Sequence, residues 1–442
     1  MNLRDVRPAL GAGWPDALRR GFIAFAVMAG LGQALALAVW ALAGSGRSLA
    51  TFARIGWLYV GAFHHVAIEL EGSVTFGPTG SPEPGSLALG VALLAATWLA
   101  VWLLFRAGCA VADRAGGGTA ARTLHGAKIA PAYASPMLVL AVLVSARIRV
   151  DTALVGADVR AALDPWQALV IPMVLAMLVG AAGGFGSALA ARPGEQRLAA
   201  AAAAGGWRMF SLGLLLSFGG LFVAGVVQPD EVVALVTPSS ARYYQEAFDR
   251  PEVGTLVLTH HVGLAPNEAV WTLVPAMGGC DGIWGDDRVD VLCYGRFPTS
   301  LRLLRPGSFP PIDVGGLDVG RAPAGYFLFL LVPAAASAFG GRRAAESLQA
   351  GRRRAVLAGV LAGGVFAALV TGAALLSVVT VRSEVAGSET ARWLVGPNVL
   401  GALLGALVWG TVGGAAGAAT VRPAATAPGT KPGPGPGGTP PR

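Results

Sequence analysis

The sequence predicts an all-α polytopic membrane protein with about eight transmembrane helices, arranged in two pseudo-symmetric four-helix repeats. The mean hydropathy is +0.60. Hydrophobic residues make up 54% of the 442 positions, and charged residues only 13%. A soluble chain of this length would carry about twice that charge. Many of the apolar runs approach the ~20 residues that cross a bilayer as a helix.

Eight apolar runs are long enough to span a membrane. Two further stretches, about 55–70 and 253–279, are short or are broken by Pro, His and Glu. We expect each of these to be a re-entrant or interfacial segment that starts and ends on the outer side. The eight runs lie at about 21–43, 86–105, 130–148, 165–190, 208–227, 324–340, 355–381 and 395–420.

The basic residues predict the orientation of the chain. Five segments hold 19 of the 33 basic residues but only 5 of the 25 acidic ones. Basic loops stay in the cytoplasm, so both termini are expected there, in a multi-pass protein of the plasma membrane. Because these charges alternate with apolar runs, they do not form a face for nucleic acid. The five segments are 1–20, 106–129, 191–208, 341–354 and 421–442.

The same charges divide the chain into parts. We expect a cytoplasmic N-terminus (1–20), a first membrane repeat (21–207) and a second membrane repeat (208–420). The second repeat carries an extracytoplasmic insertion at about 280–323. The tail, 421–442, is rich in Pro and Gly with no apolar period, so it is expected to be a disordered cytoplasmic segment.

The order of features predicts a duplication. "RRGF" at Arg19 and "WRMF" at Trp207 each open a half, and each half ends in a Gly-rich helix entered at Pro165 or Pro397. Four crossings per half would relate the halves by a pseudo-two-fold axis along the membrane normal. Glycines spaced i, i+4 favour close helix packing; they are Gly180 and Gly184, Gly359 and Gly363, Gly401 and Gly405, and Gly410 and Gly414.

Four of the five histidines form two adjacent pairs, in "FHHVAIELEG" and "THHVGLAPNE". Duplication predicts that the pairs face one another near the outer leaflet. One helical turn would place Glu69 beside the first pair, and Pro266 would open a short helix beside the second. The predicted polar cluster is His64, His65, Glu69, His260, His261, Asn267 and Glu268.

Three interpretations of this cluster stay open. The imidazoles could anchor broken backbone at the interface, because such backbone needs hydrogen-bond partners. They could line a path for a solute or protons, because histidine titrates near neutral pH. Four imidazoles and a carboxylate could hold zinc or copper, but adjacent helical histidines point about 100° apart. We therefore assign no metal ligand.

The three cysteines divide into a pair and a single residue. Cys280 and Cys293 bracket "DGIWGDDRVDVL", which reads as a hairpin on the outer side. A disulfide between them is expected there. Cys109 is expected to be an apolar filler.

The stretch "HHVGLAPNEAVWTLVPAMGGC" and the hydrophobic layout resemble the streptophobe family of actinobacterial membrane proteins. They also resemble, more distantly, the PerM-like proteins linked with mycobacterial cell division. Arginine far outnumbers lysine, which occurs only at Lys128 and Lys431, as expected from a high-GC genome. The first half departs from the resemblance, because no Pro-Asn pair follows His65. The resemblance implies a role in the cell envelope and brings no catalytic residues.

The architecture favours a permease- or channel-like protein of unassigned substrate. The alternative is a membrane scaffold that binds envelope or cell-division partners through its outer region. The spans carry no Asp, Glu, Lys or Arg at mid-depth, where ion-coupled transporters place them. No Walker loop, dinucleotide fingerprint or His-Glu-x-x-His occurs, so we expect neither an enzyme nor a cofactor. The lipid bilayer is the one certain partner, and the oligomeric state is left unassigned.

Overall fold

The computed structural model describes most of the chain, and the account below concerns that part. The described residues are 9–42, 48–76, 83–151, 155–190, 195–227, 251–284, 288–293, 297–298, 319–320, 324–348, 351–385 and 388–422. The expected tail beyond residue 422, the first eight residues and most of the insertion at 280–323 lie outside it.

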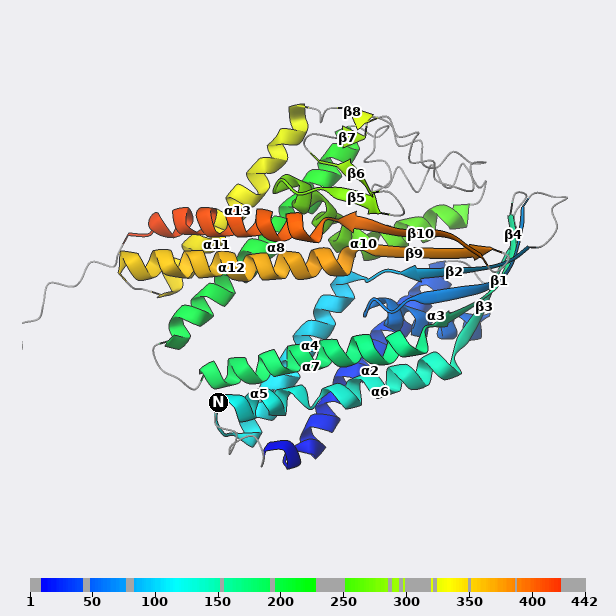
Figure 1. The fold of residues 1–442 in the computed structure, drawn as a ribbon, viewed down its shortest axis with the longest axis horizontal. Coiled ribbons are helices and arrows are strands. Elements are labelled where there is room, and N and C mark those ends of the chain that lie inside the picture. The colour runs from blue at the N-terminus through cyan, green and yellow to red at the C-terminus, as the bar shows by residue number, and fades with distance from the viewer. Residues whose placement is uncertain are drawn as a thin grey trace, which may run out of the picture.

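Residues up to 190 form helices interrupted by two β-hairpins (Figure 1). The second hairpin leaves and re-enters the helices directly, because α6 continues into β3 and β4 continues into α7. The elements are α2 (Trp14–Leu42), α3 (Leu49–Ala62), β1 (Ile68–Phe76), β2 (Glu83–Gly90), α4 (Leu94–Ala115), α5 (Thr119–Ala127), α6 (Ala130–Leu143), β3 (Ser145–Asp151), β4 (Val155–Leu163) and α7 (Pro165–Ala190).

The remaining residues form a second series of helices and strands. The elements are α8 (Glu195–Val227), α10 (Pro251–Ala276), β5 (Asp281–Trp284), β6 (Arg288–Leu292), β7 (Phe297–Pro298), β8 (Val319–Gly320), the 3₁₀-helix η4 (Ala324–Leu330), α11 (Leu331–Leu348), α12 (Arg352–Ser377), β9 (Val379–Val385), β10 (Ser388–Pro397) and α13 (Val399–Ala419).

Seven helices of the described chain are long and apolar enough to cross a membrane: α2, α4, α5 joined to α6, α7, α8, α12 and α13. They confirm the prediction of a helical multi-pass membrane protein. The remaining predicted span, 324–340, falls on η4 and the first part of α11. The second half of α11 carries Arg342, Arg343 and Glu346, and these charges lower the mean hydropathy of the helix.

Small residues fill the helix contacts, and large apolar residues face outward. A Cβ on Gly108 of α4 or on Gly126 of α5 would overlap the carbonyl of Gly180 in α7. Leu178, by contrast, is 61% exposed and Leu404 is 55% exposed. Soluble proteins rarely expose apolar patches of this extent, whereas lipid covers them in a membrane. The predicted close packing at Gly180, Gly184, Gly359, Gly363, Gly410 and Gly414 is confirmed by backbone contacts to neighbouring helices.

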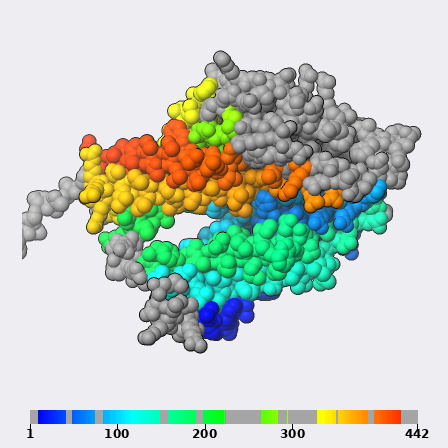
Figure 2. Space-filling view, in the orientation of Figure 1, coloured from blue at the N-terminus to red at the C-terminus, as the bar shows by residue number. Residues whose placement is uncertain are grey.

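An eight-stranded antiparallel sheet joins the two series of helices at one end of the bundle (Figure 1). The strand order is β3-β4-β1-β2-β9-β10-β5-β6. At its centre β2 pairs with β9, from Gly85 opposite Val385 to Gly90 opposite Thr380. The prediction of an all-α fold is therefore incomplete: only the β5–β6 hairpin was expected from the sequence, and it is confirmed. Figure 2 shows α12 and α13 (orange to red) above α6 and α7 (cyan to green).

The two faces of the sheet differ in polarity because side chains alternate along each strand. Leu70 lies opposite Leu87 and Ala161, and this face packs with Val60 and Phe63 beside α3. The other face carries mixed charge; its described members include Glu69, Glu71, Arg147, Asp158, Arg160, Arg382, Glu384 and Arg392. The sheet is therefore amphipathic.

Candidate functional site

The first histidine pair lies in the turn that ends α3. The backbone N–H groups of His64 and His65 donate to Gly61 and Ala62, and that of Val66 reaches back to Gly61 at 3.1 Å. A hydrogen bond from an N–H to the carbonyl five residues earlier is a common way for a helix to end. The residue just before that N–H adopts the left-handed conformation and is usually glycine. Here His65 occupies that position with φ of 61°. A non-glycine residue held there costs on the order of 1 kcal/mol.

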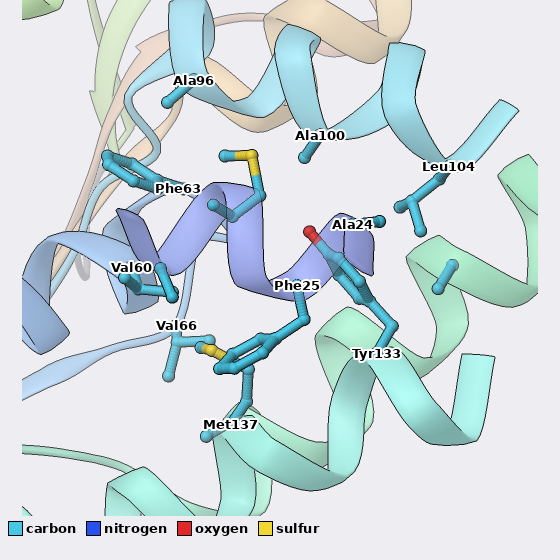
Figure 3. Close-up of a cluster of buried hydrophobic side chains, with 14 of the residues drawn as sticks. Ala24, Phe25, Val60, Phe63, Val66, Ala96, Ala100, Leu104, Tyr133 and Met137 are labelled. Carbon is cyan, nitrogen blue, oxygen red and sulfur yellow. The ribbon is translucent and has the colours of Figure 1, made fainter. Parts of the chain in front are cut away.

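His64 belongs to the core of the first series of helices. Its Nδ1 lies 2.7 Å from the Val60 carbonyl and its Nε2 lies 2.6 Å from the Tyr133 hydroxyl. Because a carbonyl only accepts, Nδ1 carries the proton, and Nε2 accepts from Tyr133. Figure 3 shows Tyr133 among Phe25, Ala24 and Leu104. Burial lowers the pKa of His64 to about 4, and with both nitrogens engaged it has no lone pair for a metal.

His65 instead reaches the second series of helices. Its Nδ1 lies 3.2 Å from the carbonyl of Leu376, near the end of α12, and therefore donates to it. Its ring also lies beside Gly90 and Thr380. Burial lowers the pKa of His65, which keeps the imidazole neutral and leaves Nε2 as an acceptor. No hydrogen bond from a described residue engages Nε2.

A partly open cavity of about 510 Å³ lies beside His65 where the two series meet. Among the described residues, three polar side chains contribute to it: those of His65, Thr380 and Asn398. The other described lining residues are apolar and come from α7, α12, β10 and α13 and from the junction between α12 and β9. They are Ile171, Leu375, Leu376, Val378, Leu394, Pro397 and Val399.

Glu69 lies in β1, so the prediction that one helical turn places it beside His65 is wrong. The chain leaves the helix at Phe63, and the strand begins at Ile68. The left-handed His65 redirects the backbone between them. Burial first, then the charges of Asp164 and Glu71, raise the pKa of the Glu69 carboxyl. Because side chains alternate along β1 and Leu70 lies on the apolar face, Glu69 lies on the polar face of the sheet.

Asn267 connects the two series of helices. It is 3% exposed, its Nδ2 donates to the Ala92 carbonyl at 2.7 Å, and its Oδ1 accepts from the Leu94 N–H at 3.2 Å. It thereby binds one of the N–H groups that a helix N-terminus leaves unpaired, here at α4. The prediction that Pro266 opens a short helix is wrong, because α10 begins at Pro251 and Pro266 lies inside it. Glu268 follows in the same helix.

The two histidine pairs do not occupy matching places. His64 and His65 follow the end of α3, whereas His260 and His261 lie within α10. The side chains of the second pair are outside the described part, so a shared cluster stays a prediction. Among the described residues, no three His, Cys, Asp or Glu side chains are grouped as metal ligands are.

Cys280 and Cys293 form the expected disulfide across the β5–β6 hairpin, with 4.7 Å between their Cα atoms. The third cysteine, Cys109, donates from Sγ to the Gly183 carbonyl at 3.2 Å. Beside the disulfide, Asp281 is 8% exposed and its Oδ1 has no hydrogen-bond partner among the described residues. Burial raises the pKa of that carboxyl well above its ordinary value.

The sequence analysis missed three site residues: Tyr133, Thr380 and Asn398. Tyr133 and Thr380 stand in apolar runs and give no local signal. Asn398 had one, because an Asn directly before an apolar run is an N-cap signal. Its Oδ1 accepts from the N–H groups of Leu400 and Gly401, each at 3.1 Å.

The fold and the cavity define an integral membrane protein with a helical multi-pass domain and a β-sheet at one end. No protein-family model, curated protein or solved structure matches the chain.

Proposed function

We propose that the chain contains two copies of one structural unit. The first support is a repeated set of hydrogen bonds. Asp164 donates its N–H to the Ala67 carbonyl and caps α7 by accepting from Trp166 and Gln167. Asn398 likewise donates its N–H to the Cys280 carbonyl, and it caps α13 in the same way.

Matching glycine contacts are the second support. In the second half a Cβ on Gly341 of α11 or on Gly359 of α12 would overlap the carbonyl of Gly414 in α13. The three residues correspond to Gly108, Gly126 and Gly180 of the first half. Asp164 then corresponds to Asn398, and Pro165 corresponds to Val399 rather than to Pro397.

This correspondence aligns the turn at His65 with the turn at Gly278. The Gly278 N–H donates to Pro275 and the Gly279 N–H reaches back to Val274, as His65 and Val66 do after α3. Gly278 has φ of 91°. The two histidine pairs are therefore not copies of one another. We propose that the halves repeat along the sheet, with β9 beside β2, instead of facing each other across a closed two-fold axis.

We propose that the protein is a membrane scaffold that presents the sheet outside the plasma membrane, with both termini in the cytoplasm. The observation that carries this function is the ladder between β2 and β9, which joins the halves through six residue pairs. Alternating access needs one half to rock against the other. Rocking would break this ladder and the bonds of Asn267 and His65, so the junction favours a static role.

The polar face of the sheet is the proposed partner surface. Arg147 pairs with Asp158 at 2.7 Å, and Arg382 pairs with Glu384 at 2.7 Å. Mixed charge of this kind supports binding to an envelope protein and not to nucleic acid. An envelope role also agrees with the proposed streptophobe membership.

The permease-like function remains the second candidate. The cavity between the halves favours it, since transporter sites lie at repeat interfaces. A distance measurement separates the two functions. Spin labels at Ala115→Cys and Arg353→Cys, at helix ends away from the sheet, report the separation of the halves in a Cys109→Ala background. A scaffold gives one narrow distance distribution in nanodiscs, whereas a rocking transporter gives two.

Partner binding has its own test. A photo-crosslinking amino acid is placed in living cells at Glu71, on the polar face, and at Leu404 as the lipid-facing control. The scaffold function predicts a discrete protein adduct at Glu71 alone, which weakens when Arg382→Glu and Arg392→Glu are combined. Equal adducts at both positions would contradict it.

A further inference from the structure

We propose that the cavity beside His65 binds a single membrane lipid with an uncharged, hydroxyl-bearing head group. The cavity lies where α7, α12 and α13 meet the sheet, which is the level at which the apolar helices end. The exposed side chains of Leu375 (59%) and Leu394 (39%) belong to its walls. Lipid chains around the helices therefore reach the cavity directly. The inference does not depend on the scaffold function.

The identity of residue 65 is the first support. The turn needs a left-handed residue, and the corresponding turn in the second half uses Gly278. A histidine in this position is a strained choice for the fold alone. Strain of this kind is found where a side chain serves a site. Here the strained residue carries the imidazole that lines the cavity.

The polar groups of the cavity select the head group. The Nδ1 of His65 is engaged by Leu376, so Nε2 offers an acceptor. Thr380 adds a hydroxyl, which both donates and accepts. The Oδ1 of Asn398 caps α13, so its Nδ2 offers a donor. None of the described residues that line the cavity is Asp, Glu, Lys or Arg. A set of one acceptor, one hydroxyl and one amide donor suits hydroxyl groups and provides no charge for a phosphate.

The apolar walls select the rest of the ligand. Ile171, Leu376, Val378 and Val399 come from both halves and belong to the apolar part of the lining. A volume of about 510 Å³ lies within the range of ~300–1,000 Å³ of small-molecule pockets. A water-soluble polyol would leave these walls without contacts, whereas an acyl chain would cover them.

The test is photolabelling of the full chain in phosphatidylcholine vesicles. Three probes carry the same diazirine acyl chain: a diacylglycerol, a phosphatidic acid and a hydrocarbon without a head group. We expect the diacylglycerol to label peptides that contain residues 375–380 or 397–399 at least fivefold more than either other probe. Equal labelling by the hydrocarbon, or stronger labelling by the phosphatidic acid, would overturn the proposal.

Variants locate the labelling. Val378→Trp fills the cavity and should remove the excess diacylglycerol labelling. His65→Gly removes the imidazole and relieves the backbone, so it should reduce that excess severalfold without loss of folding. His65→Asn, which tolerates the left-handed region, is measured beside it and should retain more of the excess. Leu404→Trp, on the lipid-facing side of α13, is the matched control and should change nothing. Excess labelling that survives Val378→Trp would place the lipid elsewhere and overturn the proposal.

Discussion

The hydrogen bond between Tyr133 and His64 is a buried polar contact in the first-half core. Tyr133 is fully buried, and it supplies the proton that the neutral His64 ring accepts. Tyr133→Phe leaves Nε2 buried without a donor. We expect a loss of about 1–3 kcal/mol in the free energy of unfolding, measured by thermal unfolding in detergent. Tyr133→Phe combined with His64→Leu should lose less than the sum of the single variants, because both partners are then removed.

His64 also predicts a pH dependence of stability. Its pKa is about 4 in the fold and about 6.5 in an unfolded chain. Between these values the unfolded state binds more protons, so stability should rise from pH 4 to pH 6.5 and then level off. The measurement is the midpoint of thermal unfolding at pH 4.5 and pH 7. His64→Gln should flatten this slope.

Asp281 predicts a dependence of opposite sign. Its pKa is raised in the fold, so the folded state binds more protons above pH ~4. Stability should therefore fall as the pH rises from that value toward the raised pKa. Asp281→Asn should be more stable than the natural chain at neutral pH, because the amide carries no charge to bury. The difference in unfolding midpoint between Asp281→Asn and the natural chain should therefore grow from pH 4 to pH 7, and a difference that stays constant would refute this.

Sequence patterns located the histidine turn but misassigned its partners. His64 and His65 marked a break in the helix correctly, whereas His260 and His261 lie inside the continuous helix α10. The equivalence of the two pairs stays a prediction, and in the proposed repeat the counterpart of His65 is Gly278. Tyr133 and Thr380 could not be found, since only the fold brings helix α6 and strand β9 to the site from distant parts of the chain.

Glycine packing is the main feature of the helices. Gly341 in α11 meets the backbone of Gly414, so Gly341→Ala should separate α11 from α13. Such overpacking costs about 1–3 kcal/mol. The control is Gly364→Ala in α12, where a Cβ meets nothing within 4 Å. That change should stabilise the helix by about 0.5–1 kcal/mol. Thermal unfolding of both variants decides whether contact or helix propensity dominates.

The hairpin β5–β6 depends on its disulfide. Closing a loop of this size stabilises by about 3 kcal/mol in the chain-entropy model. Replacing both Cys280 and Cys293 by serine should lower the unfolding midpoint. A reductant should lower the midpoint of the natural chain and leave that of the double variant unchanged. Mass spectrometry of the unreduced protein should find neither residue as a thiol.

The strands were missed because they directly continue helices. The predicted spans 86–105 and 395–420 begin in strands, and 130–148 and 355–381 end in them. A hydropathy window of helical length includes these residues with the helix. The period of two was nevertheless present, for instance in "IELEGSVTF" and "TVRSEV". Strand order could not be predicted, since pairing of β2 with β9 joins distant parts of the chain.

At the scale of the whole molecule, the placement of the sheet makes the orientation testable. The helix ends remote from the sheet carry the basic turns at Arg114 and Arg353, which the positive-inside rule places in the cytoplasm. In a Cys109→Ala background, an impermeant maleimide added to intact cells should label Glu71→Cys and leave Ala115→Cys unlabelled until the membrane is opened. The reverse pattern would invert the topology.

The bond from Asn267 to α4 bears on the order in which the protein is made. The N–H of Leu94 and the carbonyl of Ala92 are synthesised long before the amide that satisfies them. The edge of β2 that faces β9 likewise has no hydrogen-bond partner until β9 has been synthesised. During translation, therefore, the first half enters the membrane with one edge of β2 unpaired and with α4 uncapped. It reaches its final hydrogen bonding only when the last third of the chain leaves the ribosome.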